Sequence, residues 1–327
     1  MADYGYGVYD ITRRFHSLTL SDAEAARYFA SIVGNYFDFI LRTSGTDIVK
    51  IRSCFQSISA IYRSNLRGTG SRPDWSDTHN RRAYILRFFM MHAYLVYWSL
   101  RMSLTTFQHN WKCKDRLRVC GLGGGPGSDL VGLAKFLRDT NLLPVSLLEC
   151  TVGDIYTEWE TDWRHMKREN FNEFPFSVKY LRGNLTAKNS CLTRIGLATI
   201  RSADIITMIK SFSTIAAFMR TEDAHGDLLR EIFREMKPGA LVLYIDNKYN
   251  YQHEEFRRIA RSGGVSECLF ERHETIAMPF TGYPPSIRSV AQATGIDPMD
   301  RCNVSIMLLR KPDGILGTHT GSTLFRY

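Results

Sequence analysis

A glycine-rich segment, residues 119–129, is the part of the sequence best suited to holding a ligand. It reads VCGLGGGPGSD and stands between an apolar run, RLRVCGL, and a helical pattern that begins at Ser128. Glycine lets the backbone adopt positive φ angles and lets a ligand approach without a Cβ in the way. The segment therefore predicts a strand-to-helix turn with a ligand at the N-terminus of the helix.

The class of ligand can be narrowed by the residues that follow the glycines. A Walker loop requires Lys and then Ser or Thr after its last glycine, whereas Gly127 is followed by Ser128 and Asp129. The G-x-G-x-x-G dinucleotide pattern also fails, because counting from either Gly121 or Gly123 puts another residue at its last position. An acid at the head of the helix would repel a pyrophosphate. A neutral or cationic nucleoside remains.

This glycine pattern resembles the first motif of the class I, seven-strand S-adenosylmethionine-dependent methyltransferases, in which G-x-G-x-G follows the first strand. The resemblance implies S-adenosyl-L-methionine as the cofactor, with its methionine and ribose portions against the loop. The expected cofactor-binding glycines are Gly121, Gly123, Gly125 and Gly127. The family usually has an acid two residues before the first glycine of the motif, and this chain has Gly121 there.

Later segments also match the family pattern. The family's second strand ends in an acid that accepts hydrogen bonds from both ribose hydroxyls. Glu149 stands at that expected strand end, with Asp154 as a second candidate that could equally cap a helix. The Gly-Asp pair that often follows the third strand, and reads the adenine amino group, corresponds to Gly183 and Asn184, whose carbonyl could accept the same bond. The resemblance covers about residues 118–312.

Methyl transfer from a sulfonium is an in-line displacement, so the enzyme must align the nucleophile with the methyl group. A neutral oxygen or nitrogen nucleophile must also lose a proton, which calls for a nearby base. The candidate catalytic residues are Lys210 and Asp246, at the expected carboxyl ends of the fourth and fifth strands, with His253 and His273 as further candidates. The sequence has neither Asn/Asp-Pro-Pro-Tyr/Phe nor Pro-Cys after the fourth strand. This argues against exocyclic amines of adenine or cytosine and carbon five of pyrimidines as acceptors.

The charge distribution favours RNA as the acceptor. The net charge is +9, and residues 1–117 hold 16 Lys and Arg against 9 Asp and Glu. Arginines near Trp75 and Tyr84 suit contacts with phosphates and bases. The expected substrate-binding arginines are Arg67, Arg72, Arg81 and Arg82. Two alternatives stay open: a small molecule enclosed by the N-terminal helices and the Pro-rich segment 277–300, and a binding or scaffold protein that keeps the fold without activity.

These residues need a framework, and the chain predicts two regions. From residue 118, short β-rich runs alternate with helical patterns, which is typical of βαβ units. The expected fold is α/β, a doubly wound, mostly parallel seven-stranded sheet preceded by an all-helical N-terminal module. The module is placed at 1–112 and the Rossmann-like domain at 113–327. The module's expected helices cover 21–42, with a capping box at Ser21, 46–66 and 79–104, followed by a linker over 105–115.

The seven cysteines show no zinc-ligand or redox spacing, so no metal is expected and a reducing compartment, cytoplasm or nucleus, is favoured. Segment 83–100 is strongly apolar but carries Arg87 and His92 in its middle. Because a central Arg costs about 2.5–3.5 kcal/mol on insertion scales, this segment predicts a buried helix and no membrane association. The beginning of the chain lacks the apolar run of a secretory signal.

Overall fold

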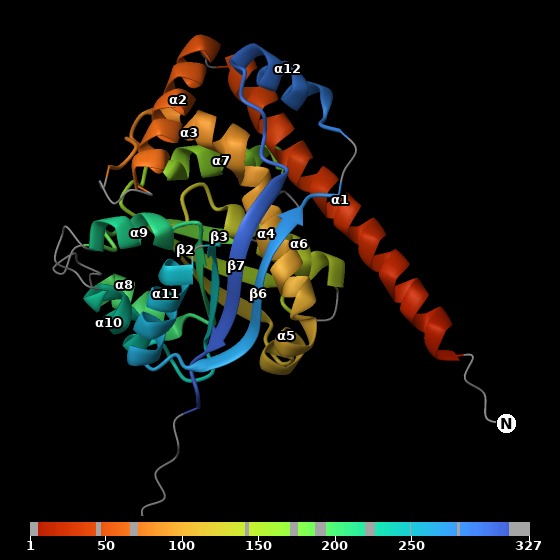
Figure 1. The fold of residues 1–327 in the computed structure, drawn as a ribbon, viewed down its shortest axis with the longest axis vertical. Helices are drawn as coiled ribbons and strands as arrows, with labels where there is room; N and C mark the ends of the chain where they lie inside the picture. Colours follow the sequence, from red (N-terminus) through yellow and green to blue (C-terminus); the bar gives the residue numbers. More distant parts are fainter. Residues whose placement is uncertain are drawn as a thin grey trace, which may run out of the picture.

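The computed structural model describes residues 6–43, 47–65, 71–140, 144–170, 176–186, 194–219, 226–248, 250–279 and 282–313. One seven-stranded sheet forms its centre, in the order β3-β2-β1-β4-β5-β7-β6 (Figure 1). Strand β7 is antiparallel to both neighbours, and every other neighbouring pair is parallel. The strands are β1 (Arg116–Leu122), β2 (Leu147–Asp154), β3 (Phe176–Arg182), β4 (Ile205–Ile209), β5 (Leu241–Asn247), β6 (Glu267–Ala277) and β7 (Arg301–Arg310). The expected α/β fold is confirmed.

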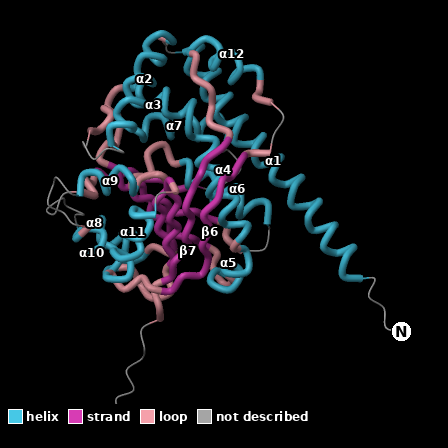
Figure 2. The backbone as a smooth tube through the Cα atoms, viewed as in Figure 1, coloured by secondary structure: helices cyan, strands magenta, loops and turns pink. Residues whose placement is uncertain are grey.

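Helices cover both faces of the sheet (Figure 2), which is why β4 and β5 read as nearly continuous apolar runs. One face packs against α1 (Tyr6–Thr43), α4 (Met90–Met102), α6 (Ser128–Thr140) and α7 (Trp159–Asn170). The other face packs against α8 (Arg194–Ser202), α9 (Phe212–Met219), α10 (Asp227–Glu235) and α11 (Asn250–Ser262). The carboxyl ends of the parallel strands therefore open between two helical layers.

Residues 78–102 form a helical run in three parts: α3 (Thr78–Tyr84), a π-helical turn η1 (Ile85–Phe89) and α4. The Asp77 carboxylate caps the run by accepting a hydrogen bond of 2.7 Å from the backbone N–H of His79. Most of α4 is buried, including His92. In the part of the chain that is described, no helix combines the length and the apolar character that crossing a membrane requires. The prediction of a buried helix is confirmed.

Two of the predicted boundaries in the helical module are wrong. Helix α1 begins at Tyr6 rather than at the Ser21 capping box, because no proline and no glycine interrupts residues 8–33. The predicted linker is mostly helix α5 (Leu104–Trp111), since Phe107 and Trp111 are buried against the core. Two more helices complete the module's surroundings, α2 (Ile48–Asn65) and, from the Pro-rich segment, α12 (Pro285–Thr294), which lies beside α1 and α2 (Figure 1).

The helical module is packed directly onto the helix that follows the glycine segment. A Cβ added to Gly132 in α6 would stand 2.4 Å from the backbone oxygen of Ala93 in α4, so only glycine permits this close approach. Buried side chains of α1, α4 and the sheet belong to one continuous core. The division at residue 112 thus separates two stretches of sequence and not two hydrophobic cores.

Candidate functional site

The turn between β1 and α6 has the backbone geometry that the glycines predict. Gly123, Gly125 and Gly127 have φ angles of +65°, +48° and +77°, a region that other residues rarely adopt. The backbone N–H of Gly123 donates to the oxygen of Gly153 at 2.7 Å, which ties the turn to the end of β2. Gly121 instead lies inside β1, paired with Val152 and Thr207, so it belongs to the strand below the turn.

The acid at the end of β2 is Asp154, and the expectation that Glu149 holds this place is wrong. Glu149 is only the third residue of β2, near its opposite end, where its carboxylate pairs with Arg116 at 2.9 Å and Arg118 at 3.0 Å. Asp154 is buried, lines a cavity beside the glycine turn and accepts hydrogen bonds from the backbone N–H groups of Gly125 and Tyr156, at 3.1 and 3.0 Å. Burial raises the pKa of Asp154 to about 6.

A first cavity of about 120 Å³ opens at this edge of the sheet, with Gly123 and Gly125 in its wall. Aromatic rings from distant segments surround it: the ring centroid of Trp159 lies 5.2 Å from that of Trp75 and 5.5 Å from that of Tyr84. The N-terminal module thus contributes directly to the wall of the cavity. The site combines a cradle of glycines, one buried carboxylate and flat apolar surfaces.

Asn184 also lines the first cavity, as expected, but its carbonyl has another use. Its Oδ1 accepts hydrogen bonds from the backbone N–H and the hydroxyl of Thr186, at 3.0 and 2.7 Å. This is the local turn geometry common for asparagine. The carbonyl that was expected to read an adenine amino group is therefore already bonded within its own turn.

Lys210 lies at the carboxyl end of β4, in the walls of the first cavity and of a second one. Its φ of +55° makes it the single non-glycine residue with positive φ in the described part of the chain. Its Nζ donates to Asn247 Oδ1 and lies 3.5 Å from Cys302 Sγ. A strained backbone at the junction of two cavities is typical of a functional residue, because strain persists where the surroundings enforce it.

The second cavity, of about 260 Å³, lies next to the first and shares Tyr62, Tyr84 and Lys210 with it. The π-helical turn and the start of α4 bring Phe88 and His92 to its wall. Burial lowers the pKa of His92 to about 3, so its ring is neutral.

Two buried polar atoms in the wall of the second cavity lack a hydrogen-bond partner among the described residues. They are Nε2 of His92 and Oε1 of Gln252, whose residues are 3% and 4% exposed. Buried polar groups are nearly always bonded, so each exception calls for an explanation. Both residues line the same cavity, which makes them candidates for contact with polar groups of a ligand.

Asp246 does not line either cavity, contrary to its expected catalytic role. It is 0% exposed, and its two oxygens accept hydrogen bonds from the backbone N–H groups of Ser213, at 2.8 Å, and Asn247, at 2.7 Å. The bond from Ser213 joins the carboxyl end of β5 to the first turn of α9, whereas the bond from Asn247 lies within the end of β5 itself. The carboxylate therefore holds the edge of the sheet together.

The four arginines expected to bind substrate have different positions. Arg72 lines the first cavity, where its guanidinium donates to Thr186 Oγ1 at 2.7 Å and stacks 3.9 Å from the ring of Phe218. Arg81 and Arg82 are 3% and 8% exposed, so the expectation that they contact an acceptor is wrong. Arg67 lies outside the described residues.

Arg81 has a structural partner that the sequence did not reveal. Its Nε donates to the Asp162 carboxylate at 2.5 Å, and its NH1 donates to the backbone oxygens of Trp75 and Ser76 at 2.7 and 2.8 Å. A buried guanidinium requires such a partner because an unpaired buried charge is costly. Through these bonds, Arg81 connects the segment that carries Trp75 to helix α7.

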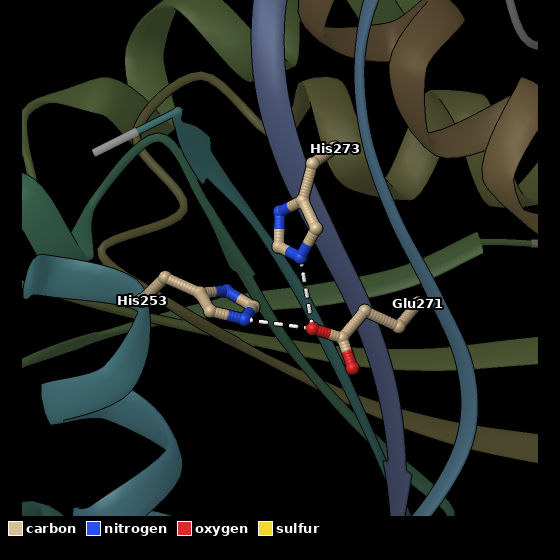
Figure 3. A group of neighbouring side chains, drawn as sticks. All are labelled: His253, Glu271 and His273. Carbon is tan, nitrogen blue, oxygen red and sulfur yellow. Dashed lines mark hydrogen bonds and ion pairs between the residues drawn. The ribbon is translucent and has the colours of Figure 1, made fainter. Parts of the chain in front are cut away.

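His253 and His273, the further catalytic candidates, form a network with Glu271 (Figure 3), and neither histidine lines either cavity. Their Nε2 atoms lie 2.8 and 2.9 Å from the same Oε1 of Glu271, the spacing of a metal-ligand group. The guanidinium of Arg257 donates to that same oxygen and lies 2.9 Å from His253 Nε2. Because an arginine already supplies the positive charge, the cluster is explained as an ion-pair network that joins α11 to β6.

Several wall residues were missed in the sequence, foremost Trp159, Tyr62 and His92. The run DIYTEW directly after the end of β2 was the available signal for Tyr156 and Trp159, since ligands bind beyond the carboxyl ends of such strands. Tyr62 and His92 carry no comparable signal, because they reach the site from helices of the N-terminal module.

The seven strands, the closing antiparallel pair and the glycine turn after β1 agree with the pattern that the sequence resembles. This is the fold of the class I S-adenosylmethionine-dependent methyltransferases. No family model matches the chain, and no curated protein sequence matches it.

Several solved structures are similar to the chain at low identity. An O-methyltransferase family protein from Burkholderia thailandensis is 15% identical, with a TM-score of 0.37 over 83% of this chain and 74% of that one. A methyltransferase from Pyrococcus furiosus is 11% identical, with a TM-score of 0.34 over 64% and 83% of the two chains. The [4+2]-cyclase SpnF is 14% identical, with a TM-score of 0.37 over 79% and 93%. At TM-scores below 0.5 this likeness carries no argument, so the fold is argued from the strand order of this chain and the activity from its site.

Proposed function

We propose that the chain is an S-adenosylmethionine-dependent methyltransferase that methylates an oxygen or nitrogen of a small molecule. The observation that carries this proposal is the pair of adjoining cavities at the carboxyl edge of the sheet. One is bounded by the glycine turn and Asp154, and the other by aromatic rings and unpartnered polar atoms. Lys210 stands in the wall of both. Such an arrangement suits a cofactor and an acceptor that meet at one point.

The first cavity fits S-adenosylmethionine in its chemistry. A carboxylate oxygen has acceptor capacity beyond one hydrogen bond, so the buried Asp154 carboxylate suits two ribose hydroxyls as well as its own turn. The rings of Tyr156 and Trp159 offer flat surfaces for an adenine. The buried acids Asp129 and Asp154 beside the glycine turn disfavour a phosphate and favour a cation. When bound, S-adenosylmethionine supplies an electrophilic methyl group on a positively charged sulfur.

The second cavity fits a small acceptor with a flat, largely apolar body. The rings of Tyr62, Tyr84 and Phe88 contribute to its walls, and such walls bind planar apolar groups well. His92 Nε2 and Gln252 Oε1 would each gain a hydrogen bond from polar groups of the acceptor. These two atoms can thus fix the acceptor's orientation, which an in-line displacement requires.

We assign to Lys210 the role of activating the nucleophile, which is an atom of the acceptor. Its ammonium group, held by Asn247 Oδ1, carries positive charge at the junction of the two cavities. A nearby cation stabilises an oxygen that has lost its proton, and therefore favours the reactive form of a hydroxyl acceptor. Lys210 would thus hold the acceptor oxygen in its deprotonated form, with the proton released to solvent, ready for the methyl group that S-adenosylmethionine would supply.

RNA, the acceptor favoured by net charge, is supported less well by the positions of the arginines. Arg81 and Arg82 are buried, and Arg72 is engaged inside the first cavity. These three side chains therefore do not form an exposed basic surface. An experiment on this protein must therefore distinguish methylation of RNA from methylation of a small molecule.

The test combines calorimetry with label transfer. We expect the purified chain to bind S-adenosylmethionine and to transfer its radiolabelled methyl group to a small-molecule fraction of a cell extract. Lys210→Met should lower transfer at least about tenfold with little change in cofactor affinity, whereas Lys248→Met, an exposed control near the end of β5, should leave both unchanged. Absence of cofactor binding would overturn the enzyme assignment. Label in RNA instead of small molecules, with affinity that falls steeply with salt, would overturn the acceptor assignment.

A further inference from the structure

The buried carboxylate of Asp129 lies beside Gly121 of β1, in space that is free because glycine has no side chain. Asp129, the second residue of α6, is 2% exposed. A Cβ added to Gly121 would stand 2.7 Å from Asp129 Oδ2 and 3.4 Å from Thr207 Oγ1. The Asp129 carboxylate therefore occupies the space into which a side chain at position 121 would point.

This carboxylate has polar neighbours but no cationic partner among the described residues. The Thr207 hydroxyl donates to Oδ2, and the backbone N–H groups of Leu130 and Asp129 also lower the pKa of the carboxyl, while Oδ1 makes no hydrogen bond of good geometry within the described residues. No lysine or arginine of the described part of the chain pairs with it, and burial raises the pKa of Asp129 to about 6. A buried acid without a cation is costly, so a ligand that brings a positive charge close to it would be favoured.

The ligand of the proposed function has that charge at its amino-acid end. We propose that Asp129 supplies the negative charge that holds the α-ammonium group of S-adenosylmethionine, in place of the acid that Gly121 lacks. The inference rests on the proposed cofactor. Asp129 does not line the first cavity itself, whereas Gly123 of the turn above it does, so Asp129 acts across the turn as a positioning residue.

The two positions are coupled, because they compete for one space. A side chain at position 121 would collide with the carboxylate of Asp129, and an acid there would add a second negative charge to a buried site. Gly121 is therefore the residue that allows the carboxylate to come from α6. Moving the acid from one position to the other should preserve its effect on the cofactor.

Two ligands that differ only at the amino-acid end provide the test. S-adenosylhomocysteine carries the α-ammonium group, and 5′-methylthioadenosine has the same nucleoside and a thioether without it. Asp129→Asn, which keeps the side-chain shape, should weaken S-adenosylhomocysteine about 10- to 100-fold in calorimetry and change 5′-methylthioadenosine by less than about twofold. Asp139→Asn, at the other end of the same helix, should change neither.

A purely structural role for Asp129 would weaken both ligands alike, and that result, or unchanged binding of S-adenosylhomocysteine, overturns the inference. A second pair of variants guards against misfolding. Asp129→Gly should lose the preference for S-adenosylhomocysteine, and Asp129→Gly combined with Gly121→Asp should restore it. Failure to restore it in a double variant with the wild-type melting temperature also counts against the inference. If the wild-type chain binds neither ligand, the proposed function itself fails.

Discussion

The carboxylate of Asp154 accepts a hydrogen bond of 3.1 Å from the backbone N–H of Gly125, so the end of β2 holds the glycine turn that follows β1. The two strands are neighbours in parallel register, with Leu122 opposite Gly153. One buried acid thus shapes the turn and presents its remaining acceptor capacity to the first cavity. Because the strands are parallel, their carboxyl ends lie at the same edge of the sheet, and residues remote in sequence come together there around one cavity.

The first prediction concerns this acid. Asp154→Ala removes both the acceptor for the ribose hydroxyls and the bond to Gly125, so affinity for S-adenosylhomocysteine should fall at least about 100-fold. Glu149→Ala, in the same strand but at its other end, should leave the affinity unchanged. Calorimetry on both variants measures the difference. Comparable losses in the two variants would contradict the placement of the ribose at Asp154.

The second prediction follows from the two acids whose pKa values burial raises to about 6, Asp129 and Asp154. Their folded-state pKa lies above the unfolded value of about 3.8, so the folded state binds more protons between these values. The contribution of these two carboxyls to the free energy of unfolding is therefore complete below about pH 4, and it is lost as the pH rises through about 6. For one such group the difference is roughly 3 kcal/mol at most.

Ligand-free protein should therefore show a lower free energy of unfolding at pH 7.5 than at pH 5. Asp129→Asn removes an ionisable buried group, so it should be more stable than the wild type at pH 7.5, by about half as much at pH 5, and nearly equal to it only below about pH 4. Chemical denaturation at the two pH values measures this. An Asp129→Asn variant that is less stable at pH 7.5 would show that the ionised carboxylate contributes to folding in the absence of a ligand.

The glycine turn and the order of elements after residue 118 could be predicted because they depend on local properties. Glycine itself permits the positive φ angles at Gly123, Gly125 and Gly127. The spacing of apolar residues indicates the alternation of strands and helices. The end of β2 was misplaced because the apolar run stops near Glu149, while the strand continues through Thr151 and Gly153 to Asp154. Backbone pairing with β1 and β3 extends the strand where the side chains give no signal.

The arginines show the opposite limit. A basic segment that contains aromatic residues is equally consistent with a surface for RNA and with a buried ion pair. Which of the two it forms depends on the acidic residue that the fold brings next to each arginine. The partner of Arg81 is Asp162, which lies 81 residues away in α7. The walls of the second cavity were hidden for the same reason, since His92 and Gln252 come from helices α4 and α11 that only the folded chain brings together.

The last prediction distinguishes the structural from the RNA-binding interpretation of Arg81. The side chains of Arg81 and Asp162 are 4% and 3% exposed, and Tyr36 donates to the same carboxylate at 2.6 Å. Arg81→Ala leaves a buried charge unpaired, so it should lower the free energy of unfolding by about 3–5 kcal/mol. The exposed pair of Arg164 and Glu160 on the same helix is the control, and Arg164→Ala should cost less than about 1 kcal/mol.

Chemical denaturation of the two variants provides the measurement, and a binding assay with RNA at two salt concentrations complements it. Because Arg81 also holds the backbone at Trp75, its loss should weaken cofactor binding as well, through the displaced wall of the first cavity. An Arg81→Ala variant with unchanged unfolding but reduced affinity for RNA would mean that the guanidinium faces an external phosphate in solution. That outcome would return the acceptor to the nucleic-acid class favoured by the net charge.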